Sequence, residues 1–190
     1  MTEPSLWLIR HGTTDWSASG RHTGRTDVAL NDSGIADAQR LRGRLEGVAF
    51  TRVQSSPLAR ASETCRLAGF GDVAEVDGDL VEWDYGDEEG LTTPQIRESR
   101  PGWSLWADGV TNGETIRQVA ARAERIIDQV VGNAGNVALF AHGHVLRVLT
   151  ARWLGLSPDA GRWFALDAGS VSVLGHEHDW RVIRRWNERP

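Results

Sequence analysis

The apolar run at residues 137–141 constrains the fold of this chain more than any other feature. It is Val-Ala-Leu-Phe-Ala, which has the length of a strand and contains no polar side chain. A strand without polar positions is buried on both faces, which is typical of the centre of a parallel sheet. Because other short apolar runs alternate with helical periods, we expect a three-layer α/β/α sandwich around a mostly parallel central sheet.

At 190 residues the chain has the length of one domain, so we expect residues 1–190 to form a single domain. The expected strands cover residues 5–9, 52–54, 73–76, 137–141, 171–174 and 180–183. Apolar residues at helical spacing predict helices over residues 35–45, 58–68, 116–130 and 145–154. Ser56 as N-cap and Pro57 at the first helical position should begin the second of these helices. Residues 82–113 show no clear period, and long connections of this kind usually have a function.

Composition excludes several kinds of chemistry and partner. All 21 basic residues are arginine, which excludes lysine Schiff bases, pyridoxal phosphate enzymes and the lysine of a nucleotide-binding P-loop. The formal net charge of -5 argues against a nucleic-acid partner. The single cysteine, Cys65, excludes an intrachain disulfide and a cysteine-based metal site. No apolar stretch reaches the ~18 residues of a membrane span, and residues 1–4 lack the features of a signal peptide, so we expect a cytoplasmic protein without a membrane partner.

Polar side chains directly follow three of the expected strands. Arg10 and His11 follow the first, Arg60 comes shortly after the second, and His142 follows the central apolar run. Ligands bind outside the carboxyl ends of parallel strands, so these arginines and imidazoles should converge on a site for a tetrahedral dianion such as phosphate. A neutral imidazole aimed at phosphorus can act as a nucleophile, giving a covalent phosphohistidine. The acid-rich segment 82–89 offers a carboxylic acid to protonate the leaving alcohol.

Four motifs along the chain resemble those of the histidine phosphatase superfamily, phosphoglycerate mutase-like branch. They are, in chain order, RHGTTDW at residues 10–16 with TGRTD at 23–27, SSPLARASET at 55–64, EWDYGDEEG at 82–90 and FAHGH at 140–144. A lone RHG would be a weak match, but four motifs in the family's order are specific. The resemblance is nearest to small acid phosphatases and to sedoheptulose-1,7-bisphosphatase of the fungal type, and it implies a phosphoglycerate mutase-like fold with no metal or cofactor.

The resemblance also implies roles for individual residues. His11 would be the phosphorylated nucleophile, and Glu82 would be the general acid and then the base that activates water. The other residues around the phosphoryl group would be Arg10, Arg60 and His142. The implied substrate contacts are Ser17, Thr23, Gly24, Trp83, Asp84, Tyr85 and Gly143. The expected activity is hydrolysis of a small phosphate ester, with a sugar phosphate or bisphosphate suited to the polar loops.

A phosphoglycerate mutase is one alternative from the same family. Mutases have further basic residues after the proton-donor loop, typically a lysine and an arginine pair, whereas residues 91–100 contain neither. Water is therefore the expected acceptor, which favours a phosphatase. A binding protein built on an inactive phosphatase would lack a nucleophile or a phosphate-binding residue, and none of these is missing here. The sequence leaves a homodimer open.

A metal-dependent hydrolase is an alternative from another class. The pairs His142-x-His144 and His176-x-His178 have a spacing that is common among metal ligands, and they would need a carboxylate such as Asp15 or Asp167. The intervening glycine and the helical pattern that begins there weaken this interpretation. We expect His176 and His178 to be surface residues in the turn before the last strand.

Overall fold

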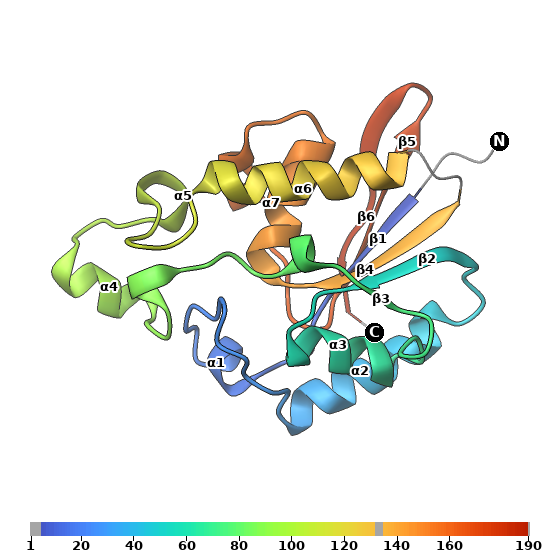
Figure 1. Ribbon diagram of the computed structural model, residues 1–190, viewed down its shortest axis with the longest axis horizontal. Helices are drawn as coiled ribbons and strands as arrows, with labels where there is room; N and C mark the ends of the chain where they lie inside the picture. The colour runs from blue at the N-terminus through green and yellow to red at the C-terminus, as the bar shows by residue number, and fades with distance from the viewer. Residues whose placement is uncertain (1–4, 132–134, 190) are drawn as a thin grey trace.

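A six-stranded sheet forms the centre of the protein, whose computed structural model describes residues 5–131 and 135–189 (Figure 1). The strands are β1 (Ser5–Arg10), β2 (Phe50–Ser55), β3 (Glu75–Val76), β4 (Asn136–Ala141), β5 (Val171–Glu177) and β6 (Trp180–Glu188). They lie in the order β3-β2-β4-β1-β5-β6, with β1, β2, β3 and β4 mutually parallel and β5 antiparallel to both of its neighbours. The sheet is therefore mostly parallel, as predicted. The prediction about residues 1–4 lies outside the described residues.

Alternate residues of the central strands face opposite layers of helices. In β4, Val137 and Leu139 join one apolar core, while Ala138 and Phe140 join the other. The first core packs under α6 (Ile116–Val131) and α7 (Gly143–Trp153), and the second packs against α2 (Asp32–Leu45) and α3 (Ala59–Leu67). Figure 1 shows these helix pairs on opposite faces of the sheet. The three-layer α/β/α sandwich is confirmed.

The start of α3 differs from the prediction. Its N-cap is Leu58, which makes no side-chain capping hydrogen bond, and the helix begins at Ala59. Ser56 was expected to be the N-cap, but its hydroxyl accepts from the amide of Leu58, which precedes the helix, at 3.3 Å. The same hydroxyl lies 2.8 Å from Nε2 of His142. The prediction was wrong because Ser56 closes a turn before the helix and binds a distant strand end.

Residues 82–113 contain more regular structure than expected, because η2 (Gly86–Glu88), α4 (Thr93–Ser99) and α5 (Leu105–Asp108) lie there. The other short elements are η1 (Gly78–Leu80), α1 (Asp15–Ala18) and η3 (Pro158–Trp163). Between η1 and η2 the chain has neither helical nor strand structure. Gly86 is required there, because its φ is 53° and a Cβ would lie 2.0 Å from the carbonyl oxygen of Thr111. No helix in the described part of the chain is long and apolar enough to cross a membrane.

Candidate active site

A cavity of about 250 Å³ lies where β1 and β4 end. The predicted site residues that line it are Arg10, His11, Ser17, Thr23, Glu82, Tyr85 and Gly143. The predicted site residues outside its lining are Gly24, Arg60, Trp83, Asp84 and His142. The lining residues that sequence reasoning did not assign to the site are Gly20, Arg21, His22, Thr93, His144, Arg147 and Leu166.

His11 is held with one ring nitrogen free. Its Nδ1 lies 2.7 Å from the carbonyl oxygen of Gly12, and because a carbonyl can only accept, Nδ1 carries the proton and Nε2 has a lone pair. Burial lowers the pKa of His11 well below its ordinary value, and the charges of Arg10 and Arg60 lower it further. Gly12 is required because a Cβ there would lie 2.3 Å from the carbonyl oxygen of Gly34. A neutral, fixed imidazole of this kind can act as a nucleophile.

His142 lies beside His11, with the two ring centroids 5.2 Å apart. Its Nδ1 accepts a hydrogen bond of 3.1 Å from Nε of Arg60, so the proton lies on Nε2 and is donated to Ser56. Burial lowers the pKa of His142 well below its ordinary value, followed by the charges of Arg60 and His11. A phosphate dianion placed between the two rings would raise the pKa of His142, since a nearby opposite charge favours the protonated form.

Arg60 connects the strand ends to the loop around Thr23. Its side chain is fully buried and donates hydrogen bonds of 3.0 Å and 2.8 Å from Nη2 to the carbonyl oxygens of Thr23 and Gly24, and one of 2.9 Å from Nη1 to that of Thr26. Because Arg60 also donates to His142, its guanidinium orients both that imidazole and the loop around Thr23.

Arg10 lines the cavity and has one unpaired buried donor among the described residues. Its Nη1 donates to the carbonyl oxygen of Leu166, while its buried Nε has no hydrogen-bond partner among the described residues. Gly143 makes room for this side chain, because a Cβ at that position would lie 3.4 Å from Cζ and Nε of Arg10. An unpaired buried N–H is costly, and an anionic oxygen in the cavity would satisfy it. We call four residues the floor: Arg10 and His11, which line the cavity, and Arg60 and His142, which lie outside its lining with His142 beside His11.

Glu82 is held at the N-terminus of α7. Its Oε1 accepts hydrogen bonds of 2.9 Å from the amides of Trp83 and Val145, and its Oε2 accepts one of 2.9 Å from the amide of His144. The helix begins two residues earlier than expected, which brings these amides to the carboxylate. The side chain is only 4% exposed yet lines the cavity, so it can exchange a proton with a bound molecule.

An outer wall of the cavity is formed by four residues: His22, Tyr85, His144 and Arg147. The Tyr85 hydroxyl lies 2.6 Å from Nδ1 of His144. Burial raises the pKa of Tyr85 well above its ordinary value, so the phenol is protonated. Burial also lowers the pKa of His144 well below its ordinary value, with the charge of Arg147 adding to the effect. His22 stacks on His144 with 9° between the rings, and Arg147 lies over Trp106.

Three predicted substrate contacts instead hold loops together. The amide of Gly24 binds the carboxylate of Glu89, and Trp83 is fully buried with its Nε1 donating to the carbonyl oxygen of Glu114. Oδ1 of Asp84 accepts from the amide of Gly86, which closes a turn. These residues surround the cavity without reaching it, so they support the site from behind.

The ligand set of the metal-dependent alternative does not assemble. In residues 5–131 and 135–189, no three His, Cys, Asp or Glu side chains lie close enough together to hold a metal ion. His142 and His144 have different partners, as described above. His176 lies within β5 and packs on Trp153 at 5.1 Å, rather than in the turn, whereas His178 is exposed in the turn before β6.

The chain is similar in sequence to known phosphatases. The sequence pattern of the histidine phosphatase superfamily (branch 1) matches residues 6–189. An acid phosphatase of Mycobacterium tuberculosis is 43% identical over 183 residues, which cover 94% of this chain and 89% of that protein. Sedoheptulose 1,7-bisphosphatase of Saccharomyces cerevisiae is 36% identical over 187 residues, which cover 80% of this chain and 68% of that protein.

The similarity extends to the fold. A solved structure of an open reading frame product from Mycobacterium tuberculosis has a TM-score of 0.92 and 40% identity to this chain, and the match covers 97% of each chain. The expected phosphoglycerate mutase-like fold is confirmed. The chain belongs to branch 1 of the histidine phosphatase superfamily, and it is a phosphatase of that type.

Proposed function

We propose that this protein hydrolyses monoesters of a small phosphorylated metabolite, a sugar phosphate or bisphosphate, through a phosphohistidine and without a metal ion. The observation that supports the chemistry is His11, which lines the cavity together with Arg10 and whose Nδ1 is held by a carbonyl oxygen, leaving a lone pair on Nε2. The substrate class is supported by the polar lining of the cavity and by the relative named sedoheptulose 1,7-bisphosphatase. A cytoplasmic location and a homodimer remain predictions.

In the first step, Nε2 of His11 attacks phosphorus in line and the bond from phosphorus to the alcohol oxygen breaks. Glu82 donates a proton to the departing alcohol. Arg10 and Arg60, together with His142, stabilise the charge on the equatorial oxygens, as positive groups do in phosphoryl transfer. Two arginines and an imidazole supply the positive charge that a metal ion provides in other phosphatases.

In the second step, water attacks the phosphohistidine. Glu82, now a carboxylate, takes a proton from the water as it attacks, and the phosphorus–nitrogen bond breaks to release inorganic phosphate and neutral His11. The carboxylate thus returns to its acid form, and the enzyme is ready for another substrate.

The test is phosphate release by the purified protein in excess EDTA. The substrates are p-nitrophenyl phosphate, sedoheptulose 1,7-bisphosphate, fructose 1,6-bisphosphate, glucosyl-3-phosphoglycerate and 3-phosphoglycerate. Fast release from one sugar phosphate, with a radiolabelled adduct on His11 that survives alkali and is lost in acid, supports the proposal. Activity that needs added zinc or manganese favours the metal-dependent hydrolase, and isomerisation of 3-phosphoglycerate without phosphate release favours the mutase.

Two variants sharpen this test. Glu82→Gln should reduce turnover of sugar phosphates by about 10²–10⁴-fold, the usual contribution of general acid–base catalysis. His178→Ala is the control for substitution of His11, because His178 is exposed in the turn before β6. A Glu82→Gln enzyme with full activity would contradict the assigned role.

A further inference from the structure

The segment that contains Glu82 has no regular secondary structure to hold it. Residues 82–85 belong to no helix or strand, although Glu82 and Trp83 are buried. The carboxylate of Glu82 binds the N-terminus of α7, as described above. Buried backbone groups still require hydrogen-bond partners, and for this segment side chains provide them.

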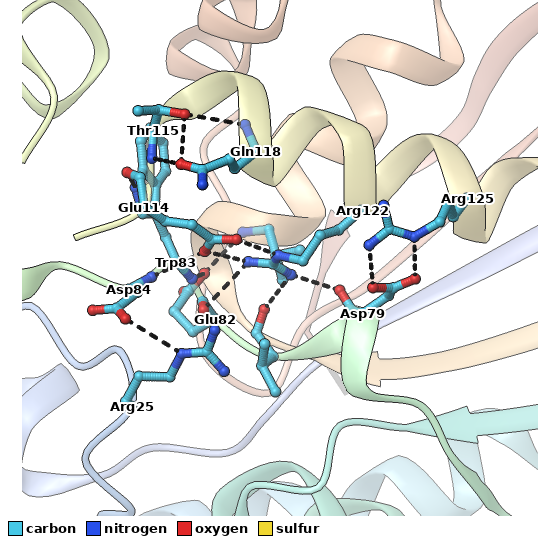
Figure 2. A network of polar contacts seen from close by, with 12 residues as sticks. Arg25, Asp79, Glu82, Trp83, Asp84, Glu114, Thr115, Gln118, Arg122 and Arg125 are labelled. Carbon is cyan, nitrogen blue, oxygen red and sulfur yellow. Dashed lines mark hydrogen bonds and ion pairs between the residues drawn. The ribbon is translucent and has the colours of Figure 1, made fainter.

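Arg122, on α6, provides the donors on one side of Glu82. It is 7% exposed, and its Nη1 donates hydrogen bonds of 2.6 Å and 2.8 Å to the carbonyl oxygens of Asp79 and Val81. Its Nη2 donates a longer one of 3.4 Å to the carbonyl oxygen of Glu82 itself. Figure 2 shows this guanidinium among the backbone carbonyls and the carboxylate of Glu114. One side chain therefore holds the backbone from residue 79 to residue 82.

Glu114 holds the chain on the other side of Glu82. Its carboxylate forms a two-point ion pair with Arg122, with distances of 2.7 Å to Nε and 2.8 Å to Nη2, and also accepts from the amide of Asp84 at 3.2 Å. Its backbone accepts from Nε1 of Trp83 and donates to the carbonyl oxygen of Asp84. Burial alone would raise the pKa of Glu114, but the hydrogen bonds and charge of Arg122 outweigh it and the pKa is lowered.

We propose that Arg122 and Glu114 are positioning residues for the general acid. The pair contacts the backbone before, at and after Glu82, and α7 holds its carboxylate, so the acid is fixed between α6 and α7 at the cavity. This inference rests on the proposed role of Glu82 in protonating the leaving alcohol. It goes further by assigning a catalytic effect to an ion pair that does not line the cavity.

The test uses two leaving groups of different acidity. An alkyl phosphate, such as a sugar phosphate, needs a proton from Glu82 as the alcohol leaves, whereas p-nitrophenolate leaves well without one. The readout is kcat/KM, which reports the steps up to departure of the leaving group and omits the later attack of water, in which Glu82 serves both substrates. In Arg122→Met, kcat/KM for the alkyl phosphate should fall by about 10–100-fold, because small displacements of a catalytic group can cost this much. The kcat/KM for p-nitrophenyl phosphate should fall by less than about threefold, since His11 and its neighbours stay in place. Arg122→Lys should recover part of the loss, because one ammonium can reach the carbonyls but cannot form the two-point pair.

Arg125→Met is the matched control. Arg125 lies one turn further along α6 and pairs with the carboxylate of Asp79 at 2.6 Å, but its side chain is 57% exposed. Figure 2 shows it next to Arg122 on the same helix. Both kcat/KM values should stay within about twofold of the original enzyme, because exposed ion pairs contribute little.

Three outcomes are decisive. A selective loss with the alkyl phosphate supports the inference, whereas equal losses with both substrates, or no loss, overturn it. If Arg122→Met does not fold, the double variant Arg122→Met with Glu114→Gln leaves no unpaired buried charge and should show the same selectivity. Glu82→Gln is the benchmark: if it shows no dependence on the leaving group, the proposed function fails, but if it does and the Arg122 variants do not, only the inference fails.

Discussion

The floor and the wall of the cavity differ in what holds their side chains. In the floor, His11 binds a backbone carbonyl and His142 binds a buried guanidinium, so the ring orientations and the proton positions are both set by hydrogen bonds. The wall adds ring packing to its hydrogen bonds. His22 is centred 5.0 Å from Tyr85 and Arg147 lies 4.7 Å over Trp106, while Nε of Arg147 also donates to a carbonyl oxygen. A floor of this kind suits one geometry, that of a phosphoryl group. The wall takes His22 and Tyr85 from loops, and loops can vary with the substrate.

The largest effect should come from removing the nucleophile in the floor. His11→Ala eliminates the only group proposed to form the covalent intermediate, so turnover should fall by at least about 10⁴-fold with every substrate. The measurement is phosphate release together with trapping of the radiolabelled intermediate. Loss with one substrate and not with another would mean that the floor, too, depends on the substrate.

Arg60→Lys tests whether the floor also holds the adjacent loop. The substitution keeps the charge but removes the planar set of donors to His142 and to the carbonyl oxygens near Thr23. We expect the free energy of unfolding to decrease by about 2–4 kcal/mol, because buried carbonyls lose their partners. Turnover should decrease by about 10²-fold, as expected for misplaced catalytic groups.

Urea unfolding measures the stability change, and Arg66→Lys on the same helix is the control. Arg66 pairs with Glu63 at the surface, with a side chain that is 61% exposed. Its substitution should change the free energy of unfolding by less than about 0.5 kcal/mol. Equal effects of the two substitutions would show that Arg60 adds nothing beyond an ordinary surface arginine.

The floor could be predicted from the sequence because three of its members directly follow strands. Arg10 ends β1, His11 is the next residue, and His142 follows β4, so recognising the strands was enough to bring them together. The start of α3 could not be predicted in this way. Ser56 binds His142, which lies 86 positions away, and no pattern around Ser56 indicates that contact.

The wall was harder to predict for the same reason. The hydrogen bond between Tyr85 and His144 joins positions 59 apart, and His22 comes from a loop near the start of the chain. His144 belongs to a motif that was recognised, but spacing alone suggested a metal ligand rather than a partner of Tyr85. Only packing of the loops over the sheet defines which of these side chains meet.

The buried histidines of the floor predict that stability falls as the pH falls. Burial and nearby arginines lower the pKa values of His11 and His142 well below the ordinary value. The two imidazoles therefore stay neutral in the folded protein, whereas the same imidazoles in the unfolded chain take up protons below about pH 6.5. Because the unfolded state then binds more protons, the free energy of unfolding falls with decreasing pH. The slope should reach up to about 1.4 kcal/mol per pH unit for each histidine.

Urea unfolding between pH 7.5 and pH 5.5 measures this slope. His178→Asn should leave the slope unchanged, because His178 is exposed in the turn before β6. A stability that is constant over this range, or that rises as the pH falls, would contradict neutral histidines in the floor. The wall adds to the slope through His144, whose pKa is also lowered by burial and the charge of Arg147.

The smallest effect should come from Tyr85→Phe, which changes the wall alone. Phenylalanine keeps the buried ring but removes the hydroxyl that bonds to Nδ1 of His144. The His144 ring, which lines the cavity, then loses the partner that orients it. We expect the sugar phosphate to lose one hydrogen bond to this ring, which costs about 1 kcal/mol and corresponds to roughly a fivefold increase in KM.

The comparison between substrates decides what Tyr85→Phe means. p-Nitrophenyl phosphate has no sugar hydroxyls to contact the wall, so its kcat and KM should stay within about twofold of the original enzyme. A similar loss of kcat with both substrates would place His144 in the chemical step, since its backbone amide also binds Glu82. The floor and the wall would then be one catalytic unit, and the choice of substrate would have to depend on other residues of the cavity, such as Arg21 and Thr93.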